Sequence, residues 1–356
     1  MFDISTIIDI YPFGLDKSAK TKLYVNAMTS LVKHHYANSI NYSNIIDVLG
    51  YPKIEYLEDV PFLPIGLFKK IELKSISSES ISKIITSSGT CGQEVSRIFL
   101  DEKNASDQRK VLIKIISTFT EKKRLPMLVI DSPFVLSNRE LFSARGAAIL
   151  GYSLLGADIT YALNKDMELD IDVVNNFLKK YNNQKVLIFG FTFVIWEKFI
   201  QALEKNNLNY DIKDGILMHG GGWKKMIDVE VDNPTFKRKI KQILGVNKIY
   251  NYYGMAEQTG SVFMECEYGY LHSSIFSDIL IRDPFDFKIL GKEEKGLIQL
   301  LSLLPTSYPG HSILSEDIGL LHGEDDCRCG RLGKYFSVHG RIKKAEIRGC
   351  SDVYSS

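Results

Sequence analysis

The chain has 356 residues, of which 45% are hydrophobic and 24% charged, and its formal net charge is +1. This ordinary globular composition suits one large domain with lobes, or two domains. A net charge so close to zero provides no overall field to attract nucleic acid or an acidic membrane, so neither is expected as a partner.

The sequence also lacks the signs of export and membrane insertion. No stretch reaches the roughly 18 uninterrupted apolar residues that a membrane-spanning helix needs. The first residues have no basic start and no export pattern. Five cysteines in a chain of this length do not form a disulfide framework. We therefore expect a reduced, cytoplasmic protein without a membrane span.

Residues 1–80 are predicted to form an N-terminal helical lobe, with helices at 23–36 and 42–49. Residues 81–260 then alternate between strands and helices. The expected strands are 84–86, 127–131, 158–162, 186–191, 215–219 and 248–252. The expected helices are 104–120, 143–155, 170–181, 194–205 and one from 233 that closes at Gly245. This alternation predicts an α/β nucleotide-binding core with a mainly parallel sheet flanked by helices.

The pattern changes after residue 260. Short strands are expected at 278–282, 287–290, 297–304, 318–322 and 335–339, separated by turns. They predict a smaller, more antiparallel, β-rich lobe of the same large domain over residues 261–340. Residues 341–356 are expected to form a short C-terminal tail.

A loop of small and hydroxyl-bearing residues follows the strand expected at 84–86. Its candidate phosphate-binding residues are Ser87, Ser88, Gly89, Thr90 and Gly92. Glycines let backbone amides approach phosphate oxygens, hydroxyls add donors, and Arg97 adds a positive charge. The Gly-x-x-x-x-Gly-Lys pattern of a Walker A loop is absent. The alternative is a plain polar turn.

Two further turns follow expected strands. Gly220, Gly221 and Gly222 leave room for a flat group against the backbone, although a flexible turn is the alternative. Tyr253 can stack on a base, and Glu257 offers the hard oxygen ligand that Mg²⁺ prefers. Such sites form at the carboxyl edge of a parallel sheet. The alternative is a buried tyrosine pair beside a surface glutamate.

Three groups near the C-terminus complete the candidate residues. The Asp317 carboxylate can accept hydrogen bonds from ribose hydroxyls, and the Arg341 guanidinium can bind hydroxyl or phosphate oxygens. Taken singly, each is an ordinary surface charge. Cys350 lies among basic residues, which favour the thiolate that attacks acyl groups. An incidental tail cysteine is the alternative.

A metal centre is the other possibility for the cysteines. Cys327 and Cys329 are separated by one residue, which is tighter than the usual Cys-x-x-Cys zinc knuckle. Cys266 and Cys350 could complete four thiolates, but nothing in the sequence joins them. The question of a metal at Cys327 and Cys329 stays open.

Taken together, these features resemble the adenylate-forming superfamily and, within it, the LuxE-type acyl-protein synthetases. Blocks similar to that family occur in its order over nearly the whole chain. They are residues 60–69 (VPFLPIGLFK), 219–225 (HGGGWKK), 253–258 (YGMAEQ), 305–311 (PTSYPGH) and 340–350 (GRIKKAEIRGC).

The resemblance implies an adenylate-forming fold and a ligase that forms a carbon–sulfur bond. ATP and Mg²⁺ would activate a fatty or related carboxylic acid as acyl-AMP. The acyl group would then pass to Cys350 as a thioester, from which an acyl reductase partner would take it. The resemblance also implies that the 87–92 loop holds phosphate, assisted by Arg97. The other implied roles are adenine contacts for Gly220–Gly222 and Tyr253, Mg²⁺ binding for Glu257, and ribose binding for Asp317 and Arg341.

The chain departs from the superfamily pattern in three places. Ala256 replaces a threonine or serine whose hydroxyl meets the α-phosphate in many members, and Cys91 replaces a common threonine. The sequence also ends soon after Arg341, so we expect the C-terminal domain with its late catalytic lysine to be truncated. This favours a self-acylating enzyme over an aryl- or acyl-CoA ligase of the phenylacetate-CoA ligase kind. A non-catalytic subunit of a reductase complex is the third hypothesis.

Overall fold

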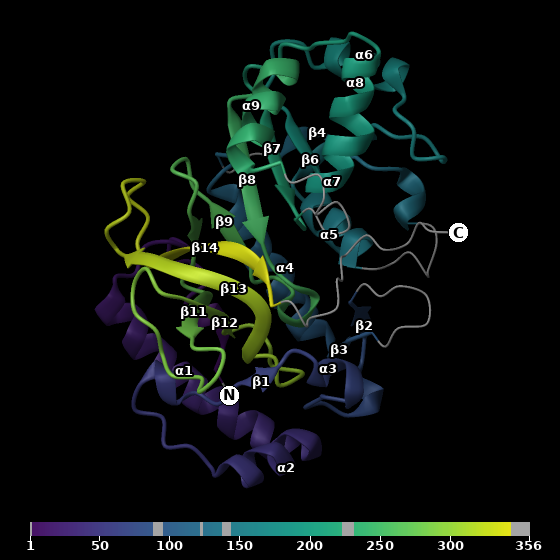
Figure 1. Cartoon of the computed structure of the whole chain (residues 1–356). Coiled ribbons are helices and arrows are strands. Elements are labelled where there is room, and N and C mark those ends of the chain that lie inside the picture. Colours follow the sequence, from purple (N-terminus) through teal and green to yellow (C-terminus); the bar gives the residue numbers. More distant parts are fainter. Residues whose placement is uncertain (1, 88–94, 122–123, 137–143, 223–230, 343–356) are drawn as a thin grey trace. The chain divides into compact units, whose positions relative to one another are not determined.

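The computed structural model describes residues 2–87, 95–121, 124–136, 144–222 and 231–342 (Figure 1). The chain divides into two compact units. Among the described residues, 2–87, 95–115 and 254–342 belong to unit 1, and those from 116 to 253 belong to unit 2. No helix among these residues is long and apolar enough to cross a membrane.

Unit 2 contains a parallel sheet whose strands lie in the order β8-β7-β6-β4-β5. The strands are β4 (Leu125–Ile130), β5 (Gly156–Tyr161), β6 (Leu187–Phe191), β7 (Ile216–Gly220) and β8 (Lys248–Tyr253). β6 and β7 are buried throughout, as expected for strands of a parallel sheet covered on both faces. The mainly parallel sheet predicted from the alternating pattern is therefore confirmed.

Helices pack on both faces of this sheet. They are α5 (Ala144–Ser153), α6 (Ile171–Lys180), α7 (Thr192–Val194), the π-helical turn η5 (Ile195–Ile200), α8 (Gln201–Lys205) and α9 (Asn233–Leu244). Helices α6, η5 and α9 share one core with Ile188 and Leu217 of the sheet. Tyr152 of α5 stacks on Phe189, with ring centroids 4.1 Å apart. Phe189 follows Ile188 in the strand and therefore points to the other face.

Local signals fix where α9 begins and ends. Asp232 caps the N-terminus, with its carboxylate 2.7 Å from the backbone amide of Thr235, and Pro234 lies in the first turn. Gly245 ends the helix with a φ of +69°, a left-handed conformation that favours glycine. The helix predicted from residue 233 to Gly245 is confirmed.

Unit 1 combines N-terminal helices with an antiparallel sheet. The helices are α1 (Lys17–Asn38), α2 (Ile40–Leu49), α3 (Leu67–Lys70) and most of α4 (Glu102–Ser117). The main strands are β9 (Phe263–Glu265), β10 (Leu271–His272), β11 (Ser277–Arg282), β12 (Lys295–Ser302), β13 (Ser312–Glu324) and β14 (Lys334–Arg341). They lie in the order β11-β12-β13-β14-β10-β9. The short strand β1 (Leu63–Pro64) pairs with β13, while β2 (Lys83–Thr86) and β3 (Arg97–Leu100) form a separate hairpin.

The antiparallel β-rich region is thus confirmed, but its elements differ from the prediction in detail. The strand predicted at 287–290 is wrong, because residue 289 forms only an isolated bridge to Arg282. Phe287 has a φ of +57°, and its amide donates to the Asp283 carbonyl, so this segment is a turn. β13 extends beyond the predicted 318–322. β1, β9 and β10 were not predicted, because strands of two or three residues give no readable alternation.

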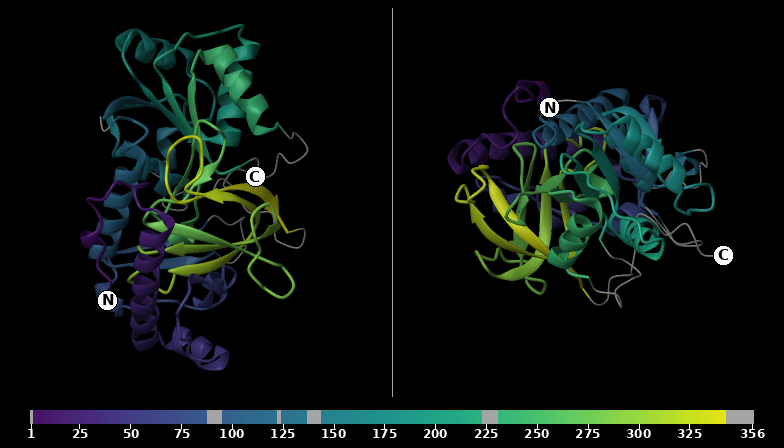
Figure 2. Two further views of the ribbon diagram at one scale, coloured as in Figure 1. Left: turned by 90° about the vertical axis from the view of Figure 1, so that its left-hand side faces the viewer. Right: turned by 90° about the horizontal axis from the view of Figure 1, so that it is seen from above.

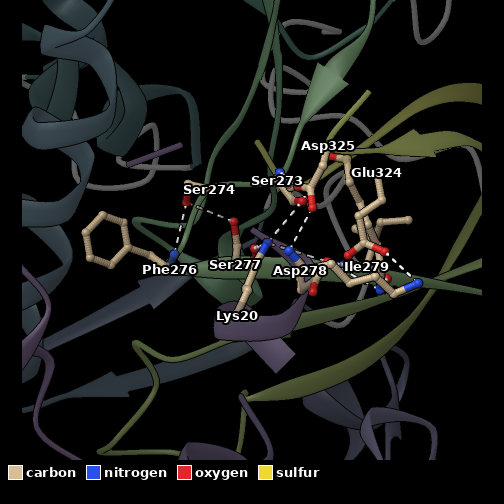
Figure 3. A network of polar contacts seen from close by, with 12 residues as sticks. Lys20, Ser273, Ser274, Phe276, Ser277, Asp278, Ile279, Glu324 and Asp325 are labelled. Atoms are coloured by element: carbon tan, nitrogen blue, oxygen red, sulfur yellow. Dashed lines mark hydrogen bonds and ion pairs between the residues drawn. The ribbon is translucent and has the colours of Figure 1, made fainter. Parts of the chain in front are cut away.

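Helix α1 lies beside the strands of this sheet (Figure 2). A buried polar network joins the helix to the sheet (Figure 3). The Lys20 ammonium, on a residue only 2% exposed, donates to the Ser273 hydroxyl at 3.2 Å and to the Ser277 carbonyl at 3.0 Å. It also lies 3.6 Å from the Asp278 carboxylate, which Lys334 approaches at the same distance. Paired charges of this kind hold a polar side chain inside a core without an unpaired ion.

Candidate active site

Glu257 is the most informative of the candidate residues. It lies in the short 3-10 helix η7 (Ala256–Gln258) and is only 4% exposed. Burial raises the pKa of its carboxyl group. The Ser96 hydroxyl and the Arg341 charge act in the opposite direction, and Asp317 raises the pKa further. Glu257 is therefore not the surface glutamate of the alternative interpretation. A cation that approaches a buried carboxylate of this kind stabilises its charged form.

Asp317 and Arg341 are paired directly. They are opposite each other in the β13–β14 ladder, and Arg341 Nε donates to Asp317 Oδ1 at 2.8 Å. The Asp317 side chain is 12% exposed and the Arg341 side chain 40% exposed, so one end of the pair is accessible. Both residues influence the pKa of Glu257. Unit 1 thus brings together three candidate residues that are far apart in the sequence.

The β2–β3 hairpin brings one end of the predicted phosphate loop to the same neighbourhood. The Ser96 amide donates to the Ser87 hydroxyl at 2.9 Å, and the Ser87 amide donates to the Ser96 carbonyl. Arg97 begins β3 opposite Thr86 and is exposed. Since β3 packs against η7 and Ser96 lies beside Glu257, this hairpin is part of the Glu257 environment. Ser88, Gly89, Thr90 and Gly92 lie outside the described residues, as does Cys350.

The glycine turn and Tyr253 lie at the carboxyl edge of the parallel sheet of unit 2. Gly220 ends β7 and lies opposite Tyr252 of β8, and Tyr253 is the last residue of β8. A Cβ on Gly220 would lie 2.6 Å from the Tyr252 ring, and one on Gly221 would lie 2.5 Å from the Phe191 ring. These glycines are thus required by close packing against aromatic rings. Among the described residues, by contrast, no atom would lie within 4 Å of a Cβ added to Gly222.

Tyr308 and Gly310 support Glu257 and were not singled out as site residues by sequence reasoning. The Tyr308 hydroxyl donates to the Glu257 carbonyl at 2.9 Å, and burial raises the pKa of this phenol. A Cβ on Gly310 would lie 2.9 Å from the same carbonyl oxygen. Gln258 donates from Nε2 to the Gly310 carbonyl at 2.8 Å. The family-like block at 305–311 contains both Tyr308 and Gly310, so it was the available signal.

Comparisons with known proteins identify the family. The sequence model of the protein family described as "Acyl-protein synthetase, LuxE" matches residues 3–356 of this chain. A curated protein of Vibrio harveyi, the long-chain-fatty-acid–luciferin-component ligase, is 21% identical over 326 residues, which is 90% of this chain and 84% of that protein.

Solved structures show the same fold at low sequence identity. 2-Hydroxyisobutyryl-CoA ligase, in an open conformation with 2-HIB-AMP and CoA, has a TM-score of 0.70 and 15% identity, covering 94% of this chain and 77% of that chain. ATP-bound MatB from Rhodopseudomonas palustris has a TM-score of 0.50 and 13% identity, covering 75% of this chain and 49% of that chain. The adenylate-forming fold expected from the sequence is therefore confirmed.

Proposed function

Because the chain belongs to the LuxE acyl-protein synthetase family and is a ligase, we propose that it activates a fatty acid with ATP and then carries the acyl group on Cys350. The observation that supports this most is the buried Glu257 carboxylate with the Asp317–Arg341 pair in its electrostatic surroundings. An ion pair that only joined the two strands would not need a buried carboxylate as a third charged group nearby. We propose a fatty acid as the substrate because the curated relative is named a long-chain-fatty-acid ligase, and ATP as the nucleotide because MatB binds it.

Mg²⁺ fits the donor set. Glu257 offers a hard carboxylate oxygen, and the burial that raises its pKa would be offset by a divalent cation. When bound, the ion would supply charge neutralisation at the phosphates. In this proposal Asp317 accepts from the ribose hydroxyls, and Arg341 orients Asp317 through their hydrogen bond. Gly220–Gly222 and Tyr253 contact adenine.

Activation replaces a poor leaving group with a good one. An oxygen of the fatty acid carboxylate attacks the α-phosphorus of ATP, and the bond from that phosphorus to the pyrophosphate oxygen breaks. Donors of the 87–92 loop, with Arg97, would stabilise the charge that develops on the phosphate oxygens. Ser87 is held for this role by its contacts with Ser96. The products are acyl-AMP and pyrophosphate.

Transfer then forms the thioester. The Cys350 thiolate attacks the acyl carbonyl carbon, the carbon–oxygen bond to AMP breaks, and AMP leaves with the electron pair. Basic residues flank Cys350 in the sequence and favour its thiolate form. A thioester keeps the acyl group reactive enough for reduction, so we propose an acyl reductase as the partner that removes it. A cytoplasmic location stays a prediction.

Incubation of the purified chain with ATP, Mg²⁺ and radiolabelled fatty acid tests the proposal. We expect label on the protein that withstands denaturation and is released by neutral hydroxylamine, which cleaves thioesters. Cys350→Ser should abolish this label, while the neighbouring change Ser351→Ala should retain it. Hydroxylamine-sensitive label on Cys350→Ser would refute the acceptor assignment. A soluble acyl-CoA, formed when CoA is added, would indicate the CoA ligase alternative instead.

A further inference from the structure

Four side chains that bind soft metals come together in unit 1, and none of them is among the residues assigned above. Cys266, His272, Cys327 and Cys329 each offer one ligand atom, and these atoms lie within 4.8 Å of one another. Cys266 and His272 are 0% exposed, and Cys327 is 8% exposed. The three cysteines are free thiols rather than disulfides. We propose that this cluster binds a structural zinc ion through three thiolates and one imidazole.

The distances suit one tetrahedral ion. Zinc–sulfur bonds of about 2.3 Å and zinc–nitrogen bonds of about 2.1 Å place neighbouring ligand atoms roughly 3.6 Å apart. Cys329 Sγ and His272 Nε2 are 3.3 Å apart. Four protein ligands leave no open position for water or substrate, and the burial of the cluster likewise points to a structural ion rather than a catalytic one.

Strand pairing explains how the ligands meet. Cys266 and His272 come from the β9–β10 hairpin, which the Cys266 amide closes by donating to the Tyr270 carbonyl at 2.8 Å. Cys327 and Cys329 lie in the turn between β13 and β14. Because β10 pairs with β14, with His272 opposite Tyr335, the hairpin and the turn lie side by side. The sequence could not reveal this, and the fourth ligand is a histidine that sequence reasoning did not consider.

The turn that holds Cys327 and Cys329 is fixed independently of any metal. The Asp325 carboxylate accepts from the amides of Gly333 and Lys17, each at 2.7 Å. The Gly330 amide donates to the Cys327 carbonyl, and Gly330 has a φ of +77°. The Lys20 network of Figure 3 adjoins this turn through Ser273, which donates to the Lys334 carbonyl. A preformed turn lowers the cost of organising the metal ligands.

The surrounding charges also suit the ion. Three thiolates and one neutral imidazole around Zn²⁺ carry a net charge of −1, and the Arg331 side chain contacts Cys329. Arg331 is itself held by the Glu267 carboxylate at 2.9 Å.

The expected effect of zinc is to tie the β9–β10 hairpin to the turn between β13 and β14. The Asp317–Arg341 pair lies toward the opposite end of the β13–β14 ladder from this turn. Zinc would therefore stabilise the strands that present the proposed ribose-binding pair. Its presence does not depend on the proposed reaction.

Elemental analysis of the full chain, purified without a histidine tag and dialysed against metal-free buffer, tests the site. We expect about one zinc per chain. Cys327→Ser and Cys329→Ser should lose most of it, while Cys329→His, which preserves a ligand, should retain more than Cys329→Ser. His322→Ala is the matched control, because His322 lies on β13 outside the cluster and should leave the zinc content unchanged.

A second measurement covers the case in which the serine variants fail to fold. Wild-type protein treated with a mercurial thiol reagent should release its zinc to a colorimetric chelator, and cobalt reconstitution should give thiolate-to-metal charge-transfer absorption. A folded wild-type chain that contains no zinc after expression in zinc-supplemented medium would overturn the proposal. Iron in place of zinc, or zinc unchanged in folded cysteine variants, would do the same.

Discussion

At the scale of single residues, the candidate site depends on three charged groups in unit 1. Sequence motifs identified Glu257, Asp317 and Arg341 individually, but could not show that Glu257 is buried or that the other two pair. Burial depends on Tyr308 and Gly310, which support the Glu257 backbone from another segment. The role proposed for each residue can be measured separately.

We predict that Glu257→Gln lowers the rate of fatty-acid-dependent adenylation about 100-fold, because it removes a preorganised charge that we propose acts at the phosphates. The change conserves size, so the fold should persist and circular dichroism should match the wild type. Glu293→Gln, an exposed charge removal in the same unit, serves as the control and should retain full activity. Wild-type rates in Glu257→Gln would remove Glu257 from the site.

The same variant has a predicted effect on stability with pH. Burial raises the pKa of Glu257 in the folded state, so the folded protein binds this proton more tightly than the unfolded chain does. The resulting contribution to stability is fully present below the unfolded pKa and is lost as pH rises through the folded pKa. Without nucleotide or Mg²⁺, the Tm of Glu257→Gln relative to wild type should therefore increase from acidic to neutral pH. Differential scanning calorimetry at several pH values measures this. A difference that stays constant with pH would contradict the assigned burial.

Asp317→Asn should raise KM for ATP and leave KM for the fatty acid nearly unchanged. A hydrogen bond to a charged group is worth about 1.5–3 kcal/mol, which corresponds to roughly 10- to 150-fold in kcat/KM for ATP. Asp286→Asn, which removes a surface carboxylate paired with Lys288, is the matched control. Equal losses for both substrates would argue against a ribose contact.

At the scale of elements, periodicity was sufficient for long segments and insufficient for short ones. The helices α6 and α9 and the strands β6 and β7 appear where the sequence places them, whereas α1 covers the predicted 23–36 but already begins at Lys17. β9 and β10 are too short for a pattern, although they contribute to the metal cluster. The turn at Phe287 was predicted as a strand because its residues are apolar, and a positive φ at Phe287 cannot be read from the sequence.

The glycine turn after β7 provides a prediction at this scale. Both Gly221 and Gly222 have positive φ values, so alanine at either position costs roughly 1–2 kcal/mol. At Gly221 the new Cβ would also meet the ring of Phe191, which is 2% exposed, whereas no atom of the described part of the chain lies that near at Gly222. Gly221→Ala should therefore have a clearly lower free energy of unfolding than Gly222→Ala in urea denaturation. An equal decrease in the free energy of unfolding for both variants would show that the Phe191 ring moves aside without cost.

At the scale of the whole molecule, the family-like blocks predicted the adenylate-forming fold over nearly the whole chain. What they could not give is the set of contacts between segments that are distant in sequence. Asp317 meets Arg341, and Cys266 meets Cys327, only through strand pairing. The four-part division of the chain at residues 80, 260 and 340 stays a prediction, and so does the contribution of the 88–92 loop and Cys350.

Adenylation of a fatty acid is the step on which the rest of the proposed function depends. Exchange of radiolabelled pyrophosphate into ATP tests it most directly, since exchange requires reversible formation of acyl-AMP and is independent of the final acceptor. With purified chain, Mg²⁺ and a series of fatty acids of increasing length, we predict exchange that depends on the acid and persists in Cys350→Ser. Folded protein that shows no acid-dependent exchange across the whole series would rule out acyl-AMP formation by this chain.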